Sequence, residues 1–551
     1  MKFKAAETTA ADVLVIGGGG AGLRAAIEAR SRGADVLLVS KSRVGYGNNT
    51  AIARGAFATM GLGAPQDSPE VHFRDTLASG CFLNNQRLVE VMTRGSGELV
   101  RDLERIGVKY AIGEEGIRLG HLPGHTHART VNCVERLGTG FTLPLRRQAL
   151  DLGVRFAEGV MITRLLGAGS TASGAVGLDR EGGTRVFPAK ATVLAAAGLG
   201  QIFLRTNNAA GSTGDGYALA YQAGLPLVDM EFIQFYPTSP GDFGGTGLVV
   251  YEHLVAREGA AVRNSLGENI LPKYGIEDPM VMTRDRLARA IMLEIKEGRS
   301  EEGSLVLDLS HLSDEKVQKL RALLPKGASP GTKRFRVAPT VHFTMGGVMI
   351  DEESRTRLDG LYAAGEVCGG VHGANRLTSN ALTEVFVFGT VAGRNAALRA
   401  AGMKMPSLDA RELADERERL ESLAHSRGGE DIGELRRELR SAMWEGVGII
   451  RGAQGLNDTL GTVARLRERL GAVSVNGPAE LLKAIELGGM LTVGEIISRA
   501  ALRRTESRGS HYRTDYPKEG NPEWLKNIVV SCRDGEMELS EAPVDLVRAT
   551  P

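Results

Sequence analysis

The stretch from Val13 to Ser40 limits the possible folds of this chain more than any other. An apolar β-branched run, VLVIG, leads into a turn with Gly17, Gly19 and Gly22, followed by an alanine-rich helix and a second apolar run, DVLLVS. Strand, Gly-x-Gly-x-x-Gly turn, helix and strand within about thirty residues form the dinucleotide-binding fingerprint. The glycines allow close backbone approach to a pyrophosphate, which faces the free N–H groups of the helix. The sequence therefore predicts a Rossmann-like α/β unit that binds a dinucleotide.

The neighbouring residues indicate which dinucleotide to expect. The second apolar run ends in Ser40 and Lys41, where an acid usually binds the ribose of a nicotinamide cofactor. A second glycine turn lies in KSRVGYGNNTAIARGAF at 41–57, and a third ends the apolar run TVLAAAGLG at 192–200. Each of these two later turns alone is as well explained by a simple strand-to-turn junction, but the three turns in this order resemble those of two-domain flavoproteins, which implies FAD.

The composition excludes several classes of protein. Lys and Arg number 67 and Asp and Glu number 66, so the chain has no bulk attraction to nucleic acid or to an anionic membrane. No apolar run reaches the length of about 18 residues that a membrane-spanning helix needs. The N-terminus lacks the pattern of a signal peptide, so we expect a cytoplasmic protein. The four cysteines are scattered, which predicts no iron–sulfur, zinc or other metal site on this chain.

Residues 359–382, DGLYAAGEVCGGVHGANRLTSNAL, combine a cofactor-type turn with a group suited to carboxylates. Gly365 and Glu366 follow a short apolar strand, where a turn and a carboxylate can meet a ribityl chain. His372, Asn375 and Arg376 come next, in a segment too rich in Gly and Asn for a helix interior. A planar guanidinium on a turn suits a bidentate contact with a substrate carboxylate.

These motifs resemble those of the flavoprotein subunits of the succinate dehydrogenase/fumarate reductase family, which includes L-aspartate oxidase. The resemblance covers nearly the whole chain, as far as ESRGSHYRTDYP at 506–517. It implies an α/β fold, with a Rossmann-like FAD-binding domain, an inserted α+β capping domain and a C-terminal helical domain. The expected ranges are 1–230 and 339–401 for the FAD-binding domain, 231–338 for the capping domain, 408–508 for the helical domain and 509–551 for a mostly irregular tail.

The resemblance also implies how FAD is held. Asn49 stands where covalently flavinylated members of the family carry the attaching histidine, and no histidine lies between Gly17 and Val71. Asparagine cannot form that bond, so we expect non-covalent FAD, which favours reduction of a double bond or oxidase behaviour. The expected cofactor-binding residues are Gly17, Gly19, Gly20, Ala21, Gly22, Ser40, Lys41, Asn48, Asn49, Thr50, Gly55, Gly198, Asp215, Gly365, Glu366, Asn380, Ala381 and Leu382.

Three positions match the catalytic residues of the family. His342, in RVAPTVHFTMGG at 336–347, and Arg376 match residues that grip one substrate carboxylate. Arg284, in MTRDRLARAI, matches the arginine proposed to donate a proton to the substrate carbon. Without the resemblance, each has a structural explanation: an ion pair on a helix for Arg284, a core histidine for His342 and a clamp of its own loop for Arg376.

An arginine acid needs a proton relay, because a free guanidinium has a pKa above about 12. Glu252, in VVYEHLVAREGA, matches the glutamate that serves this relay in the family. Arg257 is the candidate for the relay arginine, although its spacing from Glu252 differs from the family pattern by a residue or two.

The other half of the substrate site departs from the family. Tyr236, in QFYPTSP, replaces a substrate-binding histidine, and Tyr251 replaces a carboxylate-binding threonine. A phenol donates one hydrogen bond but carries no positive charge at neutral pH. Fumarate remains the first expectation for the substrate, and another α,β-unsaturated acid is the competitor.

The sequence thus predicts an FAD-dependent oxidoreductase of the fumarate reductase/succinate dehydrogenase type. We expect it to act on a small unsaturated or saturated carboxylic acid and to exchange electrons with an iron–sulfur partner in a larger redox complex, peripheral to a membrane only through its partners. L-aspartate oxidase or a reductase of another enoate is the alternative enzyme. A non-catalytic flavin subunit that relays electrons is the alternative of a different class.

Overall fold

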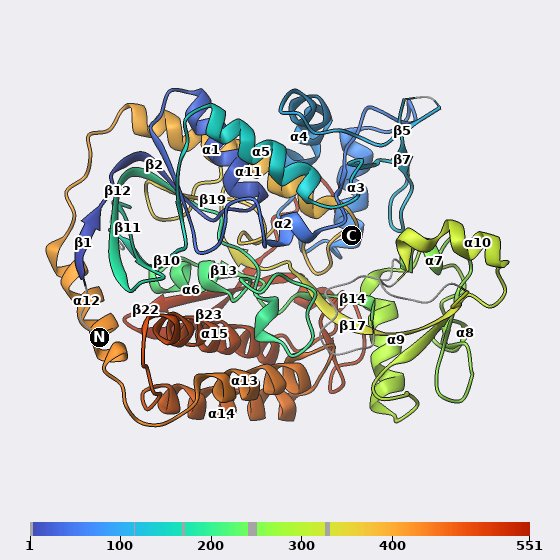
Figure 1. Cartoon of the computed structure of the whole chain (residues 1–551). Helices are drawn as coiled ribbons and strands as arrows, with labels where there is room; N and C mark the ends of the chain where they lie inside the picture. The colour runs from blue at the N-terminus through green and yellow to red at the C-terminus, as the bar shows by residue number, and fades with distance from the viewer. Residues whose placement is uncertain (1–3, 115, 168–170, 241–250, 325–330) are drawn as a thin grey trace.

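The strand that precedes the glycine turn lies inside the largest sheet of the molecule. β2 (Ala11–Ile16) pairs in parallel with β3 (Val36–Ser40) and with β12 (Gly183–Leu194). The residues of β2 and β3 are almost all buried, as expected for apolar strands of a parallel sheet covered on both faces. The computed structural model describes residues 4–114, 116–167, 171–240, 251–324 and 331–551 (Figure 1).

This sheet has eight strands and confirms the predicted α/β class. Its path runs β10-β11-β12-β2-β3-β9, and β1 and β19 also pair with β12. The remaining strand bounds are β1 (Lys4–Thr8), β9 (Arg155–Glu158), β10 (Val160–Leu166), β11 (Gly174–Asp179) and β19 (Leu361–Ala363).

Two helices that are far apart in sequence pack together beside this sheet. α1 (Gly20–Ser31) and α11 (Asn380–Ala401) approach closely because Gly393 has no side chain. A Cβ at Gly393 would lie 2.3 Å from the carbonyl oxygen of Ala25. The other elements of this domain are α2 (Asn49–Ile52), α3 (Pro69–Ser79), α4 (Gln86–Arg105), α5 (Thr139–Asp151), η1 (Gly200–Ile202), α6 (Asp215–Gln222), β4 (Ala56–Ala58), β5 (Ile112–Gly113), β6 (Gly116–Ile117), β7 (Leu119–Gly120) and β8 (Thr130–Asn132).

The region predicted as the cap, residues 231–338, has a sheet and an apolar core of its own, and the last strand of this sheet continues to Thr344. Its sheet runs β14-β17-β16-β15, and all its pairs are antiparallel. Leu287 and Ile291 of α9 are fully buried in the cap core with Leu307 and Val337 of the sheet. The bounds are β14 (Ile233–Pro240), β15 (Ala261–Arg263), β16 (Leu305–Asp308), β17 (Arg334–Thr344), α7 (Tyr251–Leu254), α8 (Ile270–Lys273), α9 (Arg284–Lys296), α10 (Asp314–Lys319) and η2 (Arg321–Leu323).

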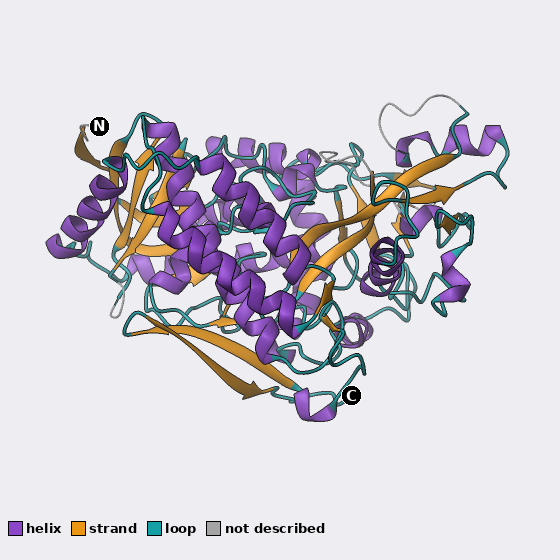
Figure 2. Cartoon of the chain, turned by 90° about the horizontal axis from the view of Figure 1, so that it is seen from below, coloured by secondary structure: helices purple, strands orange, loops and turns teal. Residues whose placement is uncertain are grey.

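The predicted helical region forms a bundle of three helices with a fourth helix apart from it. α13 (Ile432–Val447), α14 (Ala453–Leu470) and α15 (Pro478–Arg503) pack on one another, and Figure 2 shows them side by side. α12 (Ala410–Ala424) lies towards the edge of the large sheet, where Leu413 packs on Leu166 and Val186. Within the described ranges, no helix is both long and apolar enough to cross a membrane.

The C-terminal tail contains a hairpin, which the expectation of a mostly irregular tail did not include. β22 (Lys526–Arg533) and β23 (Glu536–Pro543) pair over their full length. Asp534 and Gly535 form the turn with φ values of 51° and 86°, which an Asp-Gly pair in a two-residue hairpin turn readily adopts. β22 also joins β13 (Leu227–Val228) and β18 (Gly347–Val348) in one sheet. The other short elements are β20 (Ile450–Arg451), β21 (Tyr512–Arg513) and η3 (Pro522–Trp524).

A buried ion-pair cluster ties the tail to the start of the cap. Arg504 donates to Glu231 at 2.7 Å and to Glu506 at 3.0 Å, and its guanidinium lies over the rings of Phe232 and Trp524. The side chains of Arg504, Glu231 and Glu506 are at most 1% exposed. Charges this deeply buried depend on one another, because removal of one partner leaves the others uncompensated.

We therefore expect Arg504→Met to destabilise the protein strongly, by about 3–5 kcal/mol, because Glu231 and Glu506 lose their partner. Arg503 is the matched control, since its side chain is 56% exposed and pairs with Glu541 at the surface. Arg503→Met should cost at most about 1 kcal/mol. Urea unfolding of both variants measures the difference, and equal midpoints would show that the buried cluster does not hold the tail.

Candidate active site

The glycine turn after β2 has room for a pyrophosphate but not for side chains. Gly17 has a φ of 120°, and a Cβ there would lie 2.3 Å from the carbonyl oxygen of Ala195. A Cβ at Gly22 would lie 1.9 Å from the carbonyl oxygen of Gly17. α1 begins at Gly20 with no cap from its N-cap residue Gly19 and no acidic residue in its first turn, which favours an anion there, although the Gly20 N–H already donates to Thr50 Oγ1 at 3.2 Å. This geometry fits the expected dinucleotide.

A cleft of about 130 Å³ runs along this turn. Most of the predicted cofactor-binding residues line it, namely Gly17, Gly19, Gly20, Ala21, Ser40, Lys41, Asn48, Asn49, Thr50, Gly198, Asp215 and Glu366. Gly22, Gly55 and Gly365 support its walls, since a Cβ at each would lie within 3 Å of a neighbouring atom. Asn380 does not reach the cleft, because its amide binds His72 and Thr76 of α3.

Lys41 stands where a nicotinamide-binding chain usually has an acid. In the structure its side chain forms an ion-pair network at the edge of the cofactor cleft. Its ammonium group donates to Asp215 at 2.5 Å, to Thr213 at 2.7 Å and to Glu486 at 2.9 Å. Burial alone would lower the pKa of Lys41, but the two carboxylates outweigh burial and raise it. Glu486 belongs to α15, so this network also joins the helical bundle to the cofactor cleft.

Asn49 is fixed by contacts at both ends of its amide. Its oxygen accepts from the backbone of Ala209 and from the hydroxyl of Ser212, both at 2.9 Å. Its nitrogen donates to Glu366 at 3.2 Å. The backbone of Thr344 donates to the other oxygen of Glu366. Burial raises the pKa of Glu366 to about 7, although the hydrogen bonds from Asn49 and Thr344 oppose the rise.

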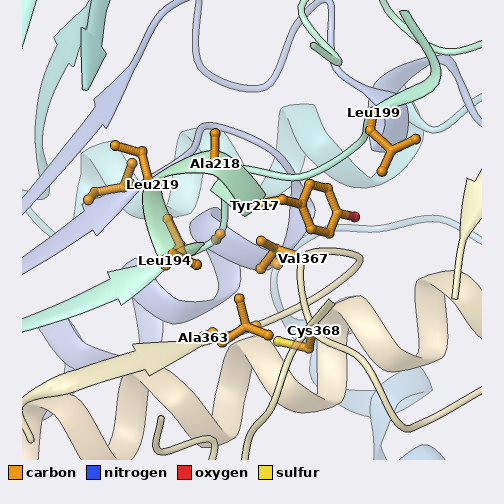
Figure 3. Packing of buried hydrophobic residues seen from close by; sticks show 14 of the residues in the cluster. Leu194, Leu199, Tyr217, Ala218, Leu219, Ala363, Val367 and Cys368 are labelled. Atoms are coloured by element: carbon orange, nitrogen blue, oxygen red, sulfur yellow. The ribbon is translucent and has the colours of Figure 1, made fainter. Parts of the chain in front are cut away.

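Cys368 lies among apolar side chains on the inner side of this turn. Figure 3 shows it near Ala363, Val367 and Tyr217. Burial raises the pKa of the Cys368 thiol well above its ordinary value, which makes the reactive thiolate scarce at neutral pH. The residue therefore packs as a structural thiol.

A second cavity, of about 400 Å³, extends from the cofactor cleft to the cap. The FAD-binding domain and the cap both contribute residues to its wall. The predicted site residues that line it are Asn49, Thr50, Tyr236, Glu252, Arg257, Arg284, His342, Glu366, Arg376, Ala381 and Leu382. The structure thus brings almost all the predicted catalytic and substrate residues to one space beside the cofactor cleft.

Arg284, Glu252 and Tyr236 form a connected group in this wall. Arg284 begins α9 and donates from Nη2 to Glu252 Oε1 at 2.7 Å. The hydroxyl of Tyr236 donates to Glu252 Oε2 at 2.6 Å, and the Arg284 guanidinium lies 5.1 Å from the Tyr236 ring centre. Burial alone would lower the pKa of Arg284, and Glu252 raises it. Both oxygens of Glu252 are therefore engaged, and the Tyr236 phenol has one committed acceptor.

Gln234 joins Arg284 to Arg376, although it was not among the predicted site residues and only begins the QFYPTSP segment that contains Tyr236. Its side-chain oxygen accepts from Arg376 at 2.8 Å and from Arg284 at 3.2 Å. Its nitrogen donates to Asn375 Oδ1 at 2.9 Å and to the carbonyl oxygen of Arg376 at 2.8 Å. Asn375 in turn donates to Asp285, beside Arg284. The only sequence signal was the position of Gln234, two residues before Tyr236 on β14.

Burial lowers the pKa of both residues of the predicted carboxylate clamp, Arg376 and His342. It lowers the pKa of Arg376 to about 9, and the nearby Arg284 contributes to the shift. Burial, Arg284 and Arg376 also hold the pKa of His342 well below its ordinary value, so its imidazole is neutral at pH 7. Nδ1 of His342 lies 3.1 Å from Oδ1 of Asn207, a second residue that no sequence motif indicated.

Two predicted residues lie differently from the expectation. Tyr251 is fully buried in the cap core with its ring 5.6 Å from that of Tyr236, and it is not among the described residues that line the cavity. Arg257 lines the cavity but is exposed, and it donates to the carbonyl oxygen of His121. Among the described residues, no hydrogen bond joins it to Glu252, so its relay role remains a prediction without geometric support.

The raised pKa of Glu366 predicts a pH dependence of stability. The folded chain keeps its proton up to about pH 7, whereas the unfolded carboxyl loses it near 4.5. The stability of the flavin-free protein should therefore fall as pH rises through this window, by at most about 3 kcal/mol from this group. Glu366→Gln should reduce the slope, and Glu104→Gln on the exposed side of α4 should not. Urea midpoints at about pH 5 and about pH 7.5 test this, and identical slopes would contradict it.

Two family models match the chain. One, described as an FAD binding domain, matches residues 12–382, and the other, described as fumarate reductase flavoprotein C-term, matches residues 436–551. One subunit of the fumarate reductase (CoM/CoB) of Methanothermobacter marburgensis is 39% identical over 94% of this chain and 97% of its own length. The fumarate reductase flavoprotein subunit of Escherichia coli is 33% identical over 99% of this chain and 96% of its own.

Solved structures agree with this assignment. The E. coli quinol fumarate reductase flavoprotein has a TM-score of 0.90 at 31% identity, covering 99% of this chain and 98% of its own. Adenylylsulfate reductase of Archaeoglobus fulgidus has a TM-score of 0.82 at 22% identity over 99% of this chain and 97% of its own, a likeness of fold alone. The chain belongs to the succinate dehydrogenase/fumarate reductase flavoprotein family and is an FAD-dependent oxidoreductase that acts on CH–CH groups.

Proposed function

We propose that this protein reduces the C=C bond of a fumarate-like unsaturated acid. The observation that carries the proposal is the meeting of two buried guanidiniums, Arg284 and Arg376, at Gln234 in the wall of one cavity beside the cofactor cleft. Arg376 has no carboxylate partner among the described residues, so it is suited to bind that of a substrate. Arg284 contacts Glu252, through which a proton given up by Arg284 can be replaced.

Each residue of the site has its own role in the proposed reaction. Arg376 and His342 bind one carboxylate and hold the double bond in a fixed orientation. The glycine turn and Glu366 would hold FAD, which would supply the hydride that the β-carbon receives. Arg284 gives a proton to the neighbouring carbon, which completes the saturated acid. A proton taken up from solvent and passed on through Glu252, 2.7 Å from Arg284, then restores the guanidinium.

We infer that electrons reach the flavin from an iron–sulfur partner. The four cysteines of this chain are free and scattered, and they supply no cluster. The relatives from M. marburgensis and E. coli are both named as subunits, which supports a multisubunit assembly for this chain as well. We place the protein in the cytoplasm, at a membrane only through its partners.

Two other functions compete with this proposal. An L-aspartate oxidase or a reductase of a different enoate would use the same clamp with another substrate, and the replacement of a histidine by Tyr236 favours a changed substrate. A flavin subunit that only relays electrons would need no carboxylate clamp. The connected group of Arg284, Glu252 and Gln234 therefore favours an enzyme over a relay.

Non-covalent attachment is the first prediction from this site. The nitrogen of Asn49 is an amide held by Glu366, and an amide cannot replace the attaching histidine. Acid precipitation of the holoprotein should therefore release all the yellow colour into the supernatant, where absorbance measures it. Flavin that stays with the washed pellet would contradict the prediction.

The second prediction concerns Arg284. Arg284→Gln keeps polarity but removes the proton donor, so reoxidation of reduced flavin by fumarate or another accepted enoate should slow about 100-fold or more. Reduction of the flavin by dithionite should be unchanged. Arg286→Gln is the matched control, because Arg286 is exposed on the same helix. Rapid-mixing absorbance under anaerobic conditions measures both steps. Reoxidation at the wild-type rate would leave Arg284 as a structural ion pair.

A further inference from the structure

The wall of the substrate cavity carries far more positive charge than the chain as a whole. The described residues that line it include six arginines and two glutamates, whereas the chain has 67 basic and 66 acidic residues. One of the glutamates, Glu252, is already paired with Arg284. Four of the arginines lie outside the predicted clamp and proton donor: Arg54, Arg118, Arg136 and Arg257.

The clamp region offers little to a second anionic group of the substrate. The Tyr236 hydroxyl is committed to Glu252 at 2.6 Å, and Tyr251 is not part of the described cavity wall. His342 is neutral because burial lowers its pKa. A second carboxylate near Tyr236 would also approach the carboxylate of Glu252. Arg284, the other cation near Tyr236, is already paired with Glu252, so the further cationic contacts of the cavity lie elsewhere in its wall.

Arg118 and Arg136 are in a position to supply it. Arg118 lies between β6 and β7, and Arg136 lies between β8 and α5. β7 and β8 pair with each other, so one small sheet supports both arginines. Both are exposed, and the side chain of neither has a hydrogen bond or ion pair with any residue that the structure describes. Both guanidiniums therefore remain available to a ligand.

The backbone conformation of Arg136 supports a role for this residue in ligand binding. Its φ is 50°, in the left-handed region that a side chain other than Gly, Asn or Asp seldom adopts. A turn bond from its N–H to the carbonyl oxygen of Cys133 at 3.1 Å helps to hold this conformation. Such strain persists where the surroundings impose it, and it is concentrated at ligand-binding sites.

The cap closes over the same part of the cavity. Arg257 follows α7 of the cap and donates to the carbonyl oxygen of His121, just after β7. Figure 1 shows β7 on the side of the FAD-binding domain nearest to α7. This contact holds the cap beside the segment that carries Arg118, so the cavity is cationic on both sides of the domain junction.

We propose that Arg118 and Arg136 form a second anion subsite of the substrate cavity and hold the anionic group of the substrate that lies farther from Arg376. This inference rests on the proposed function and names two specificity-determining residues of the same site. An exposed guanidinium binds a carboxylate less tightly than a buried one, but two of them together supply charge-assisted hydrogen bonds and a local positive potential.

The test compares pairs of substrates that differ only at the far end. The first pair is trans-but-2-enoate and fumarate, and the second pair is trans-hex-2-enoate and trans-hex-2-enedioate. Each compound is mixed with anaerobically reduced holoprotein, and the rate of flavin reoxidation is measured against substrate concentration. In the wild type, the second carboxylate of at least one pair should raise the second-order rate constant by about ten-fold or more. The variant Arg118→Gln/Arg136→Gln should bring the ratio of diacid to monoacid close to one.

The control removes the same charge elsewhere. Arg417→Gln/Arg437→Gln changes two arginines whose side chains are 70% and 66% exposed on α12 and α13. If this control lowers the ratio as much as the subsite variant does, the charges act at long range and the subsite inference is overturned. A ratio near one in the wild type, or one unchanged by the subsite variant, overturns it too, while the proposed function stands. If no enoate reoxidises the flavin, both fail.

Discussion

Two buried guanidiniums that share one neutral oxygen are the constraint on which this site depends. Arg284 and Arg376 both donate to Oε1 of Gln234, and the charge of Arg284 helps to lower the pKa of Arg376. Glu252 offsets only the charge of Arg284. The Nε–H groups of both arginines also lack a partner among the described residues. The site thus holds an excess of positive charge and of hydrogen-bond donors, which an anionic ligand can relieve.

The sheet of the cap brings the parts of this site together. β14 carries Gln234 and Tyr236, and its neighbour β17 carries His342. The register between them shifts after Gln234, and the rings of Tyr236 and His342 end 5.4 Å apart. Arg284 comes from the first turn of α9, where burial against the cap core fixes the helix. Catalytic geometry therefore depends on the packing of the cap as much as on the cofactor cleft.

The sequence predicted the parts of the fold that depend on local pattern. The glycine fingerprint predicted the β2–α1–β3 unit because only glycine fits the close contacts at Gly17 and Gly22. The hairpin of the tail was missed, although an Asp-Gly pair between alternating residues signalled it. Arg284, His342 and Arg376, which motif resemblance singled out, lie in the wall of one cavity.

Other features depend on contacts between distant segments, and no local pattern shows these. Gln234 contacts Arg376 across 142 residues of sequence. Asn380 lies in a motif that resembles a cofactor-binding segment, yet its amide is taken by His72 on α3. Tyr251 was expected beside the substrate, but it packs in the cap core with its ring against that of Tyr236. Packing between distant segments therefore decides which of the residues in a motif reach the site.

The protonation of His342 shows how substrate binding and proton chemistry are linked in this site. Its Nδ1 faces Oδ1 of Asn207, so in the neutral ring Nδ1 carries the hydrogen and Nε2 is an acceptor. An acceptor does not bind a carboxylate. Either a bound carboxylate raises the pKa of His342 so that Nε2 takes up a proton from solvent, or the amide of Asn207, whose nitrogen has no partner among the described residues, turns so that the ring hydrogen is carried on Nε2. In both cases Nε2 of His342 becomes a donor, as its proposed contact with a substrate carboxylate requires.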